Sequence, residues 1–463
     1  MKKRGKTIVI TVLVLLIVTV SPILIISFFS NKMQENLSEN EGIELDEGGS
    51  RAYIYSTPVE AKELILEGNA KNVLTFEHKN IFDVKESADC KERLKRLNER
   101  TAPTFEEPVI AYNPFGVSEN TFYFYFETSR KLMVRYTITV ENSDYNDFSR
   151  RVYSGTEDNL SQKHEFSVGG LIPGMTNYII LEVFDLDGDL INHMTYQFDA
   201  KKSAVSAPVS IRMKKGNCEE SSTNGLYFLC PKDKNAILIY DNSAVLRGEI
   251  KTLGISNGQP VIQGRDFFFA ASRTKLVRMN QVGEITGVYA IDGYSGFESF
   301  AYDGYGNLFV AAVKKKEKSL LRIDVNTGKV AKVRDLDRSL TYPDIMVQSD
   351  GKVLLYCNRN GQYIQISGAA GEVSRVTGVS GTEKDWEKTK YQKKKLISID
   401  EQTVRQLADG RWEQKYKEHV IRMEGDKGCF GEYGKDGKNI KSFETGFPIA
   451  RALKMDLKEY CFY

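Results

Sequence analysis

The stretch FAYDGYGNLFVAAVKKKEKSLLRIDVNTGKV, residues 300–330, decides the fold because its pattern recurs on both sides of it. It holds a turn, an apolar strand, a charged break, a second strand and a hairpin closing at Gly328. The preceding copy, VIQGRDFFFAASRTKLVRMNQVGEI, closes at Gly283, and the following one, VQSDGKVLLYCNRNGQYIQISGAAGEV, closes at Gly371. These glycines are 45 and 43 residues apart. Four short strands with their turns need about 40–45 residues, so the spacing predicts the blades of a β-propeller.

The predicted propeller occupies residues 203–463. A repetitive β-sandwich is the alternative, although it needs no constant step. From Gly371 the next comparable hairpin glycine is Gly437, which is 66 residues further on, or about one blade and a half. We therefore expect about six blades, with an irregular one around residues 397–423.

The N-terminus predicts a membrane anchor. Residues 2–6 hold four cationic side chains, and residues 7–29 contain no charged residue. This run is long enough to cross about 30 Å of hydrocarbon as a helix, with the basic cluster on the cytoplasmic side. A cleaved signal peptide is the alternative, but its apolar region is about 7–15 residues long and ends in a small-x-small site. We expect residues 1–30 to be a cytoplasmic tip and a single-pass signal-anchor, with the bulk of the chain extracytoplasmic.

Residues 31–104 are expected to form a stalk with two short helices. Residues 31–50 are polar and acidic, a composition typical of a flexible segment. A capping-box spacing begins the first predicted helix at residue 57, and Gly68 ends it. The second is predicted over residues 87–100, with Leu94 and Leu97 on one face and Pro103 after its end.

Over residues 105–202 the sequence pattern changes to that of closely spaced strands, which predicts an immunoglobulin-like or fibronectin-like β-sandwich. Alternating segments recur at about 8–12 residues, for example at residues 121–128 and 132–141. The phrase LIPG at 171–174, followed by Tyr178 at the start of a strand, predicts a tyrosine corner. In that corner the hydroxyl donates a hydrogen bond to the backbone just upstream.

The balance of charges and the small number of metal-ligating residues argue against two functions, nucleic-acid binding and zinc binding. The 64 Lys and Arg side chains nearly balance 62 Asp and Glu, which argues against a nucleic-acid partner. The chain has four His and no CxxC pair, which argues against zinc. Residues 185–189, DLDGD, resemble a calcium loop but lack its distal Glu, so a hairpin turn is the favoured interpretation. Outside the cell, Cys218 and Cys230 are candidates for a disulfide, and Cys429 and Cys461 for a second one.

Several phrases of the sandwich and the propeller resemble a known family. They are Asn113-Pro114-Phe115-Gly116, His164-Glu165, Leu171-Ile172-Pro173 and Asp187-Gly188, then NLFV at 307–310, RNG at 359–361 and RALKMDL at 451–457. With them, the chain from about residue 107 onward resembles the bacterial arylsulfotransferases, whose members carry an immunoglobulin-like domain ahead of a six-bladed propeller. The resemblance implies transfer of a sulfuryl group from a phenolic sulfate ester to another phenol through a sulfated histidine. It implies no nucleotide or other cofactor.

The sequence departs from the family at its catalytic positions. The family's His-His-Asp phrase falls on residues 296–298, GFE, and its Trp-x-His-x-Asn phrase on residues 341–345, TYPDI. Residues 378–397, which should carry the nucleophile, contain no His. The family arginine is matched by Arg359, and His419 is the sole histidine of the predicted propeller region.

We therefore expect a membrane-anchored binding or scaffold protein on the arylsulfotransferase plan. Its expected partner is an anionic or phenolic small molecule. Arg359 and Asn358 are candidates for an anion-binding pair, because guanidinium offers a planar fork, although the two also fit an ordinary hairpin turn. Glu298, at the family's aspartate position, and Tyr342 complete the candidate site. The alternatives are an active sulfotransferase that uses His419 or a tyrosine, and a cell-surface adhesion module.

Overall fold

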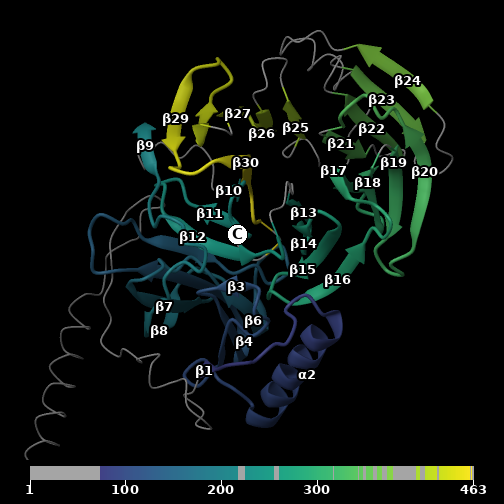
Figure 1. Ribbon diagram of the computed structural model, residues 1–463. Coiled ribbons are helices and arrows are strands. Elements are labelled where there is room, and N and C mark those ends of the chain that lie inside the picture. The colour runs from purple at the N-terminus through teal and green to yellow at the C-terminus, as the bar shows by residue number, and fades with distance from the viewer. Residues whose placement is uncertain are drawn as a thin grey trace, which may run out of the picture.

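The computed structural model describes residues 73–460 except 217–224, 255–259, 316, 343, 348–350, 358–361, 368–372, 379–402, 407–411, 425–426 and 459. This part of the chain is mainly β, with one helix (Figure 1). The expected anchor, the acidic stalk and the helix at 57–68 lie outside the described residues. Within the described part, no helix has the length and apolar character needed to span a membrane.

The helix α2 (Val84–Thr101) confirms the helix predicted at 87–100 and begins three residues earlier. It starts there because Asp83 caps it and accepts hydrogen bonds from the backbone N–H groups of Lys85 and Glu86. Ser87 is instead buried, and its hydroxyl oxygen accepts the backbone N–H of Ile285 at 2.8 Å. The helix is thus attached to the second propeller sheet (Figure 1).

The sandwich is built around one long strand that crosses between its two sheets. The stretches predicted as two strands form the single strand β4 (Phe122–Thr139), so that division was wrong. The first half of β4 pairs with β2 and β6, and the second half with β5 and β7. The other strands are β1 (Val73–Leu74), β2 (Val109–Tyr112), β5 (Phe148–Arg151), β6 (Ser161–Val168), β7 (Thr176–Phe184) and β8 (Leu190–Asp199).

The predicted tyrosine corner is wrong, because the neighbouring asparagine holds the corner. The Tyr178 hydroxyl donates to Oε1 of Glu141 at 2.5 Å and not to the backbone. Asn177, which is fully buried, accepts the N–H of Ile172 at 2.7 Å and donates to the carbonyls of Ile172 and Met175. An amide can both donate and accept, so it satisfies three backbone groups that a hydroxyl cannot serve together.

The DLDGD phrase forms the hairpin turn that was favoured over a calcium loop. Gly188, at φ +88°, donates its N–H to the carbonyl of Asp185 at 3.2 Å. The Asp185 carboxylate accepts the N–H groups of Asp187 and Asp189. These contacts join β7 to β8.

After the sandwich, the described residues form five antiparallel sheets that follow one another around a common centre, a propeller-like arrangement (Figure 1). The second, third and fourth sheets are four-stranded meanders. The second contains β13 (Val261–Gln263), β14 (Asp266–Ser272), β15 (Lys275–Asn280) and β16 (Ile285–Ala290), and the third contains β17 (Gly296–Tyr302), β18 (Asn307–Lys314), β19 (Glu317–Asp324) and β20 (Val330–Leu336). The fourth contains β21 (Asp344–Val347), β22 (Lys352–Cys357), β23 (Gln362–Ser367) and β24 (Val373–Gly378). The regular spacing of glycines in the sequence comes from the hairpin between the third and fourth strands of a sheet. Gly283 and Gly328, both at positive φ, stand between the third and fourth strands of their sheets.

The first and last sheets are irregular and close the ring. The first contains β3 (Ser118–Glu119), β10 (Leu226–Pro231), β11 (Ala236–Tyr240), β12 (Leu246–Lys251) and β30 (Ile449–Met455). The last contains β25 (Thr403–Gln406), β26 (Trp412–Tyr416), β27 (His419–Glu424), β28 (Cys429–Tyr433), β29 (Asn439–Glu444) and β9 (Arg212–Lys215). Because β30 pairs with β10 and also contacts β26 and β27, the C-terminal strand joins the two ends of the ring. The expected count of about six blades stays a prediction, because residues 379–402 lie outside the described residues.

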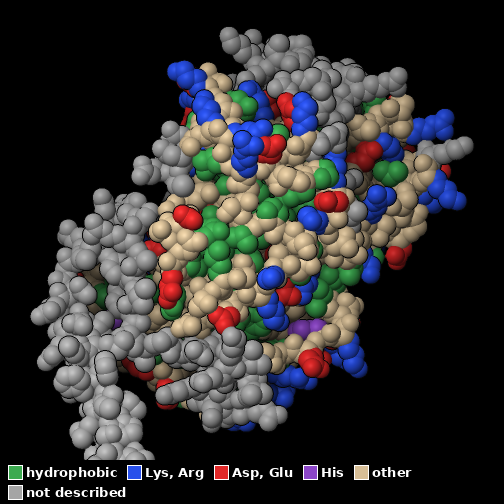
Figure 2. All heavy atoms as spheres, turned by 60° about the vertical axis from the view of Figure 1, so that its left-hand side comes forward, with side chains coloured by type: hydrophobic (Ala, Val, Ile, Leu, Met, Phe, Trp, Pro, Cys, Tyr) green, Lys and Arg blue, Asp and Glu red, His purple; other side chains and the backbone are tan. Residues whose placement is uncertain are grey.

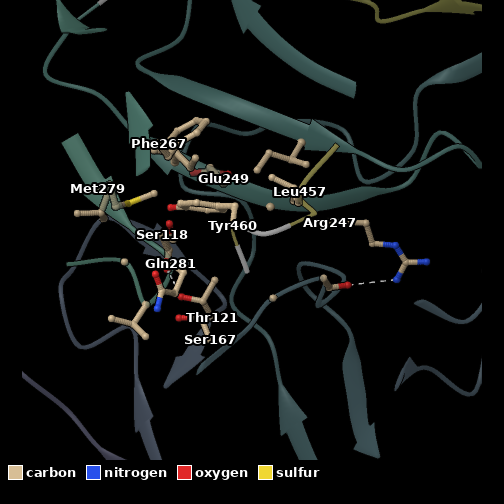
Figure 3. Close-up of a pocket in the computed structure, with 18 of the residues that line it drawn as sticks. Ser118, Thr121, Ser167, Arg247, Glu249, Phe267, Met279, Gln281, Leu457 and Tyr460 are labelled. Atoms are coloured by element: carbon tan, nitrogen blue, oxygen red, sulfur yellow. Dashed lines mark hydrogen bonds between the residues drawn. The ribbon is translucent and has the colours of Figure 1, made fainter. Parts of the chain in front are cut away.

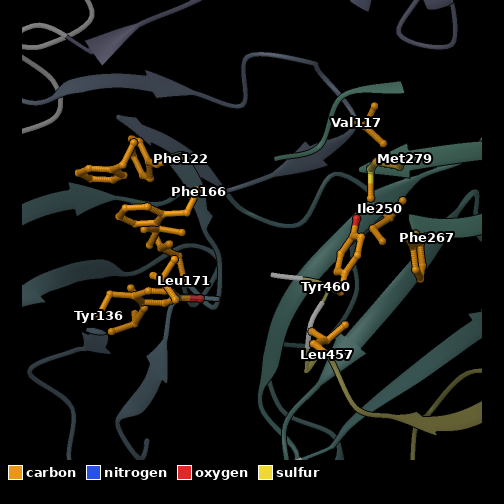
Figure 4. Close-up of a cluster of buried hydrophobic side chains, with 14 of the residues drawn as sticks. Val117, Phe122, Tyr136, Phe166, Leu171, Ile250, Phe267, Met279, Leu457 and Tyr460 are labelled. Atoms are coloured by element: carbon orange, nitrogen blue, oxygen red, sulfur yellow. The ribbon is translucent and has the colours of Figure 1, made fainter. Parts of the chain in front are cut away.

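Two buried clusters dominate the packing. One runs from the aromatic interior of the sandwich to the contact between the sandwich and the first two propeller sheets, and Figure 4 shows both of its groups, around Phe166 and around Phe267. The other fills the interface between the first and last sheets and includes Tyr227, Tyr240 and Phe443. On the surface, Figure 2 shows one face where acidic and basic side chains are interspersed and hydrophobic ones gather across the middle.

Candidate functional site

The expected anion-binding pair, Asn358 and Arg359, lies outside the described residues and stays a prediction, as does a disulfide between Cys218 and Cys230. Cys218 is also outside, and Cys230 is buried on β10. Cys461, expected to meet Cys429, is outside as well.

Glu298 and Tyr342 are brought together, as the prediction requires, but by structural contacts. Oε2 of Glu298 accepts the backbone N–H of Tyr342 at 2.7 Å, and Oε1 pairs with Nζ of Lys318. The Tyr342 residue is only 1% exposed and packs between the third and fourth sheets. In this arrangement Glu298 anchors the segment leading into β21, and the Tyr342 ring offers no open face for stacking.

His419 belongs to a buried polar group at the ring closure, which we call the closure network and define as His419, Glu432, Lys454 and Tyr227. Nδ1 of His419 lies 2.5 Å from Oε1 of Glu432. Oε2 of Glu432 accepts hydrogen bonds from Nζ of Lys454, at 2.8 Å, and from the Tyr227 hydroxyl. The Glu432 and Lys454 side chains are each 1% exposed, and that of His419 is 12% exposed.

Burial and pairing shift the pKa values of this network in opposite directions. Burial raises the pKa of Glu432, but the charge of Lys454 and hydrogen bonds from Lys454, Tyr227 and His419 outweigh it, so the pKa stays below its ordinary value. Burial lowers the pKa of Lys454 to about 8, against the opposing effect of Glu432. The network therefore holds a carboxylate in the interior by surrounding it with donors.

A second buried cation near the propeller centre was not singled out from the sequence. Arg451, on β30, is 6% exposed and lies 3.4 Å from the centroid of the Trp412 ring. Burial lowers its pKa to about 10, while the Asp344 carboxylate on β21 raises it in part. The signal for Arg451 in the sequence is the RALKMDL phrase that begins with it.

An apolar cavity lies where the sandwich meets the first two propeller sheets, and we call it the junction cavity. Its volume is about 120 Å³. Figure 3 shows Phe267 and Leu457 on one side of the Tyr460 ring, and the polar side chains of Ser118, Gln281, Thr121 and Ser167 on the other. The Tyr460 hydroxyl donates to the carbonyl of Asn280 at 2.9 Å. Arg247 also lines the cavity, but its guanidinium donates to Asp241 and to the carbonyls of Gly170 and Asn146.

A second, polar cavity of about 160 Å³ lies beside it, and we call it the side cavity. Gln281 lines both cavities, so they adjoin. The side cavity is formed by sandwich residues together with Arg265, from the hairpin between β13 and β14. Sequence reasoning missed both cavities, because their walls come from segments more than a hundred residues apart.

Comparison with known proteins supports the resemblance drawn from the sandwich. Residues 109–201 match the family model described as the arylsulfotransferase Ig-like domain. No curated protein matches the chain. The sandwich of this chain is therefore similar to the arylsulfotransferase Ig-like domain, and propeller-like sheets follow it.

Solved structures that match include virginiamycin B lyase from Staphylococcus aureus, with 10% identity and TM-score 0.29, covering 59% of this chain and 82% of that one. TolB from Acinetobacter baumannii matches with 11% identity and TM-score 0.31, covering 60% and 79%. AztD from Citrobacter koseri matches with 9% identity and TM-score 0.24, covering 70% and 98%. Scores of this size carry no conclusion about this chain.

Proposed function

We propose that the chain is a membrane-anchored, extracytoplasmic binding or scaffold protein that keeps the arylsulfotransferase plan without its histidine chemistry. A nucleophilic histidine must present a ring nitrogen to the sulfate donor. The observation that carries the proposal is the environment of His419, the sole histidine in residues 203–463. Its Nδ1 is held by Glu432, and only 12% of its side chain is exposed.

The charges around His419 also suit a structural role. Glu432 is already shared by Lys454, Tyr227 and His419, so its capacity as an acceptor is used inside the protein. A buried carboxylate with this many donors is a poor general base, since the charged form is stabilised and its pKa is lowered.

A turnover assay tests the proposal. Purified protein is mixed with an aryl sulfate donor and a phenol acceptor, and the sulfated product is measured against a heat-denatured control. We expect no turnover above the control. Turnover that disappears in Arg359→Ala would instead support the active sulfotransferase, and turnover that disappears in His419→Gln would identify that histidine as the nucleophile.

The membrane anchor is a separate part of the proposal and rests on the charge-free run at 7–29 behind a basic N-terminus. Protease added to intact, wall-stripped cells should digest the sandwich and propeller and spare a short N-terminal fragment. Full protection of the chain under those conditions would contradict this topology.

A further inference from the structure

We propose that the junction cavity and the side cavity together form a binding site for an amphiphilic organic anion, with the apolar body in the first and the anionic group in the second. The site lies between the sandwich and the propeller and shares no residue with the closure network or with the candidate set Asn358, Arg359, Glu298 and Tyr342. It therefore does not depend on the proposed function.

The junction cavity suits a small apolar body. Its deep wall is made of buried apolar side chains, among them Phe228, Ile250, Phe267 and Met279. An apolar cavity of about 150 Å³ holds a benzene ring, and the junction cavity, at about 120 Å³, is close to that size, so it suits one ring or a short alkyl chain. The polar side chains of Ser118 and Thr121 lie near Gln281 (Figure 3), and Gln281 also lines the side cavity.

The side cavity contains a positioned cation. The guanidinium of Arg265 lies 5.3 Å from the centroid of the Tyr153 ring and packs against Gly155, where there is no room for a Cβ atom. Two sandwich contacts therefore hold the side chain of a propeller residue in place. Among the described residues, no carboxylate forms an ion pair with Arg265, so its planar fork of donors is open to a ligand.

The side cavity also contains a buried donor without an acceptor. Asn159 is 9% exposed, and its Oδ1 accepts the backbone N–H of Ser154 at 2.6 Å. That contact fixes the amide orientation, so Nδ2 is the donor, and within the described part of the chain it has no hydrogen-bond partner. An unsatisfied buried donor is unfavourable by about 1–3 kcal/mol, and a ligand oxygen would satisfy it.

The other charges of the side cavity are already balanced. Lys163 pairs with Glu127 at 3.1 Å, and Glu165 pairs with Lys91 and accepts from the Tyr123 hydroxyl at 2.6 Å. His164 is neutral at pH 7, because burial lowers its pKa to about 4. Arg265 is thus the one uncompensated charge among the described lining residues, which selects an anion.

Binding assays on the full-length protein test the inference, with 4-phenylbutyrate as the complete ligand. The neutral 4-phenyl-1-butanol supplies the body alone, and butyrate supplies the anionic group with little body. By isothermal titration calorimetry we expect 4-phenylbutyrate to bind at least tenfold more tightly than either. 3-Phenylpropane-1-sulfonate replaces the carboxylate by a sulfonate and distinguishes the two kinds of anionic group.

Variants assign the binding to these cavities. Arg265→Gln should weaken 4-phenylbutyrate binding by about tenfold or more, because it removes a charge-assisted contact. Asn159→Asp keeps the acceptor for Ser154 but adds a negative charge, and should weaken the acid more than the alcohol. Ser167→Phe should fill the junction cavity and weaken both. Arg273→Gln, at an exposed arginine on the turn between β14 and β15, is the matched control and should have no effect.

Three results would overturn the inference: no binding of any of these compounds at millimolar concentration, equal binding of the acid and the alcohol, or unchanged affinity of the acid in Arg265→Gln. Thermal melts of every variant show whether a loss of binding reflects unfolding. None of these results bears on turnover of an aryl sulfate, so failure here and failure of the proposed function are separate outcomes.

Discussion

The closure network and the side cavity both bring polar side chains together where two packed units meet. They differ in how many of those side chains have a hydrogen-bond or ion-pair partner. In the closure network each carboxylate oxygen of Glu432 has a donor, and Lys454 and His419 face that carboxylate. In the side cavity, Arg265 has no anionic partner and Nδ2 of Asn159 has no acceptor among the described residues. The closure network therefore offers a ligand few new contacts, whereas the side cavity offers it two hydrogen-bond donors, the Arg265 guanidinium and Nδ2 of Asn159.

This difference separates stability from binding. Breaking a saturated network exposes a buried charge to an apolar interior, which strongly destabilises the fold. Removing an open donor at a cavity wall takes away a ligand contact and little else.

The largest effect is expected for Glu432→Gln. Glutamine keeps the shape but removes the charge, which leaves the buried ammonium of Lys454 without its counter-ion. We expect the protein to lose about 3–5 kcal/mol of stability, measured by urea unfolding. Lys435→Met, at a highly exposed ion pair with Glu418, is the control and should melt as the wild type does. A Glu432→Gln protein as stable as the wild type would show that the network contributes nothing to the fold.

His164 should make stability depend on pH within the sandwich. Its pKa in the folded state is about 4, below the ordinary value of 6.5, so the unfolded chain binds a proton first as the pH falls. Stability is therefore fully present above about pH 6.5 and decreases by about 3 kcal/mol toward pH 4. Comparing urea unfolding of the wild type and His164→Gln across this range isolates the contribution. Parallel pH curves for the two proteins would refute it.

The corner that Asn177 holds allows two substitutions at adjacent residues to be compared, Asn177→Ala and Tyr178→Phe. Asn177→Ala removes the hydrogen bonds that Asn177 makes to the buried N–H and C=O of Ile172 and one of the two donors to the carbonyl of Met175, and should cost about 2–3 kcal/mol. Tyr178→Phe removes one hydrogen bond, to Glu141, and should cost about 1 kcal/mol. If Tyr178→Phe proved the more destabilising of the two in thermal melts, the tyrosine would be the true support of the corner.

The smallest effect on stability is expected for Arg265→Gln. The residue is exposed and has no ion pair among the described residues, so the change in unfolding free energy should stay within about 0.5 kcal/mol. A large fall in melting temperature would mean that Arg265 holds the sandwich to the propeller, and that its openness to a ligand is secondary.

The parts of the fold that the sequence predicted are those with local signals. The spaced glycines Gly283 and Gly328 predicted the sheets because each terminates the same hairpin, and the helical spacing around Leu94 predicted α2. The division of β4 failed because a strand that bends from one sheet to the other has the same alternation as two strands. The corner failed because Asn177 and Tyr178 are adjacent, and the sequence does not reveal which side chain turns inward.

The candidate site was less predictable, because it depends on contacts between distant segments. Position in the family motif drew attention to Glu298 and Tyr342, and the structure places both in internal contacts. Arg265 and Asn159 carry no motif, and they share a cavity only because the β13–β14 hairpin reaches the sandwich. His419 was noted for its rarity, but its partner Glu432 had no distinguishing signal.

The most direct test of the account is a crossed measurement on Arg265→Gln and Glu432→Gln, in which both 4-phenylbutyrate affinity and unfolding free energy are determined at a temperature where both remain folded. We predict that Arg265→Gln loses affinity about tenfold with unchanged stability, whereas Glu432→Gln loses about 3–5 kcal/mol of stability with unchanged affinity. The opposite pattern, or two variants that change both quantities together, would contradict the separation of a saturated structural network from an open binding site.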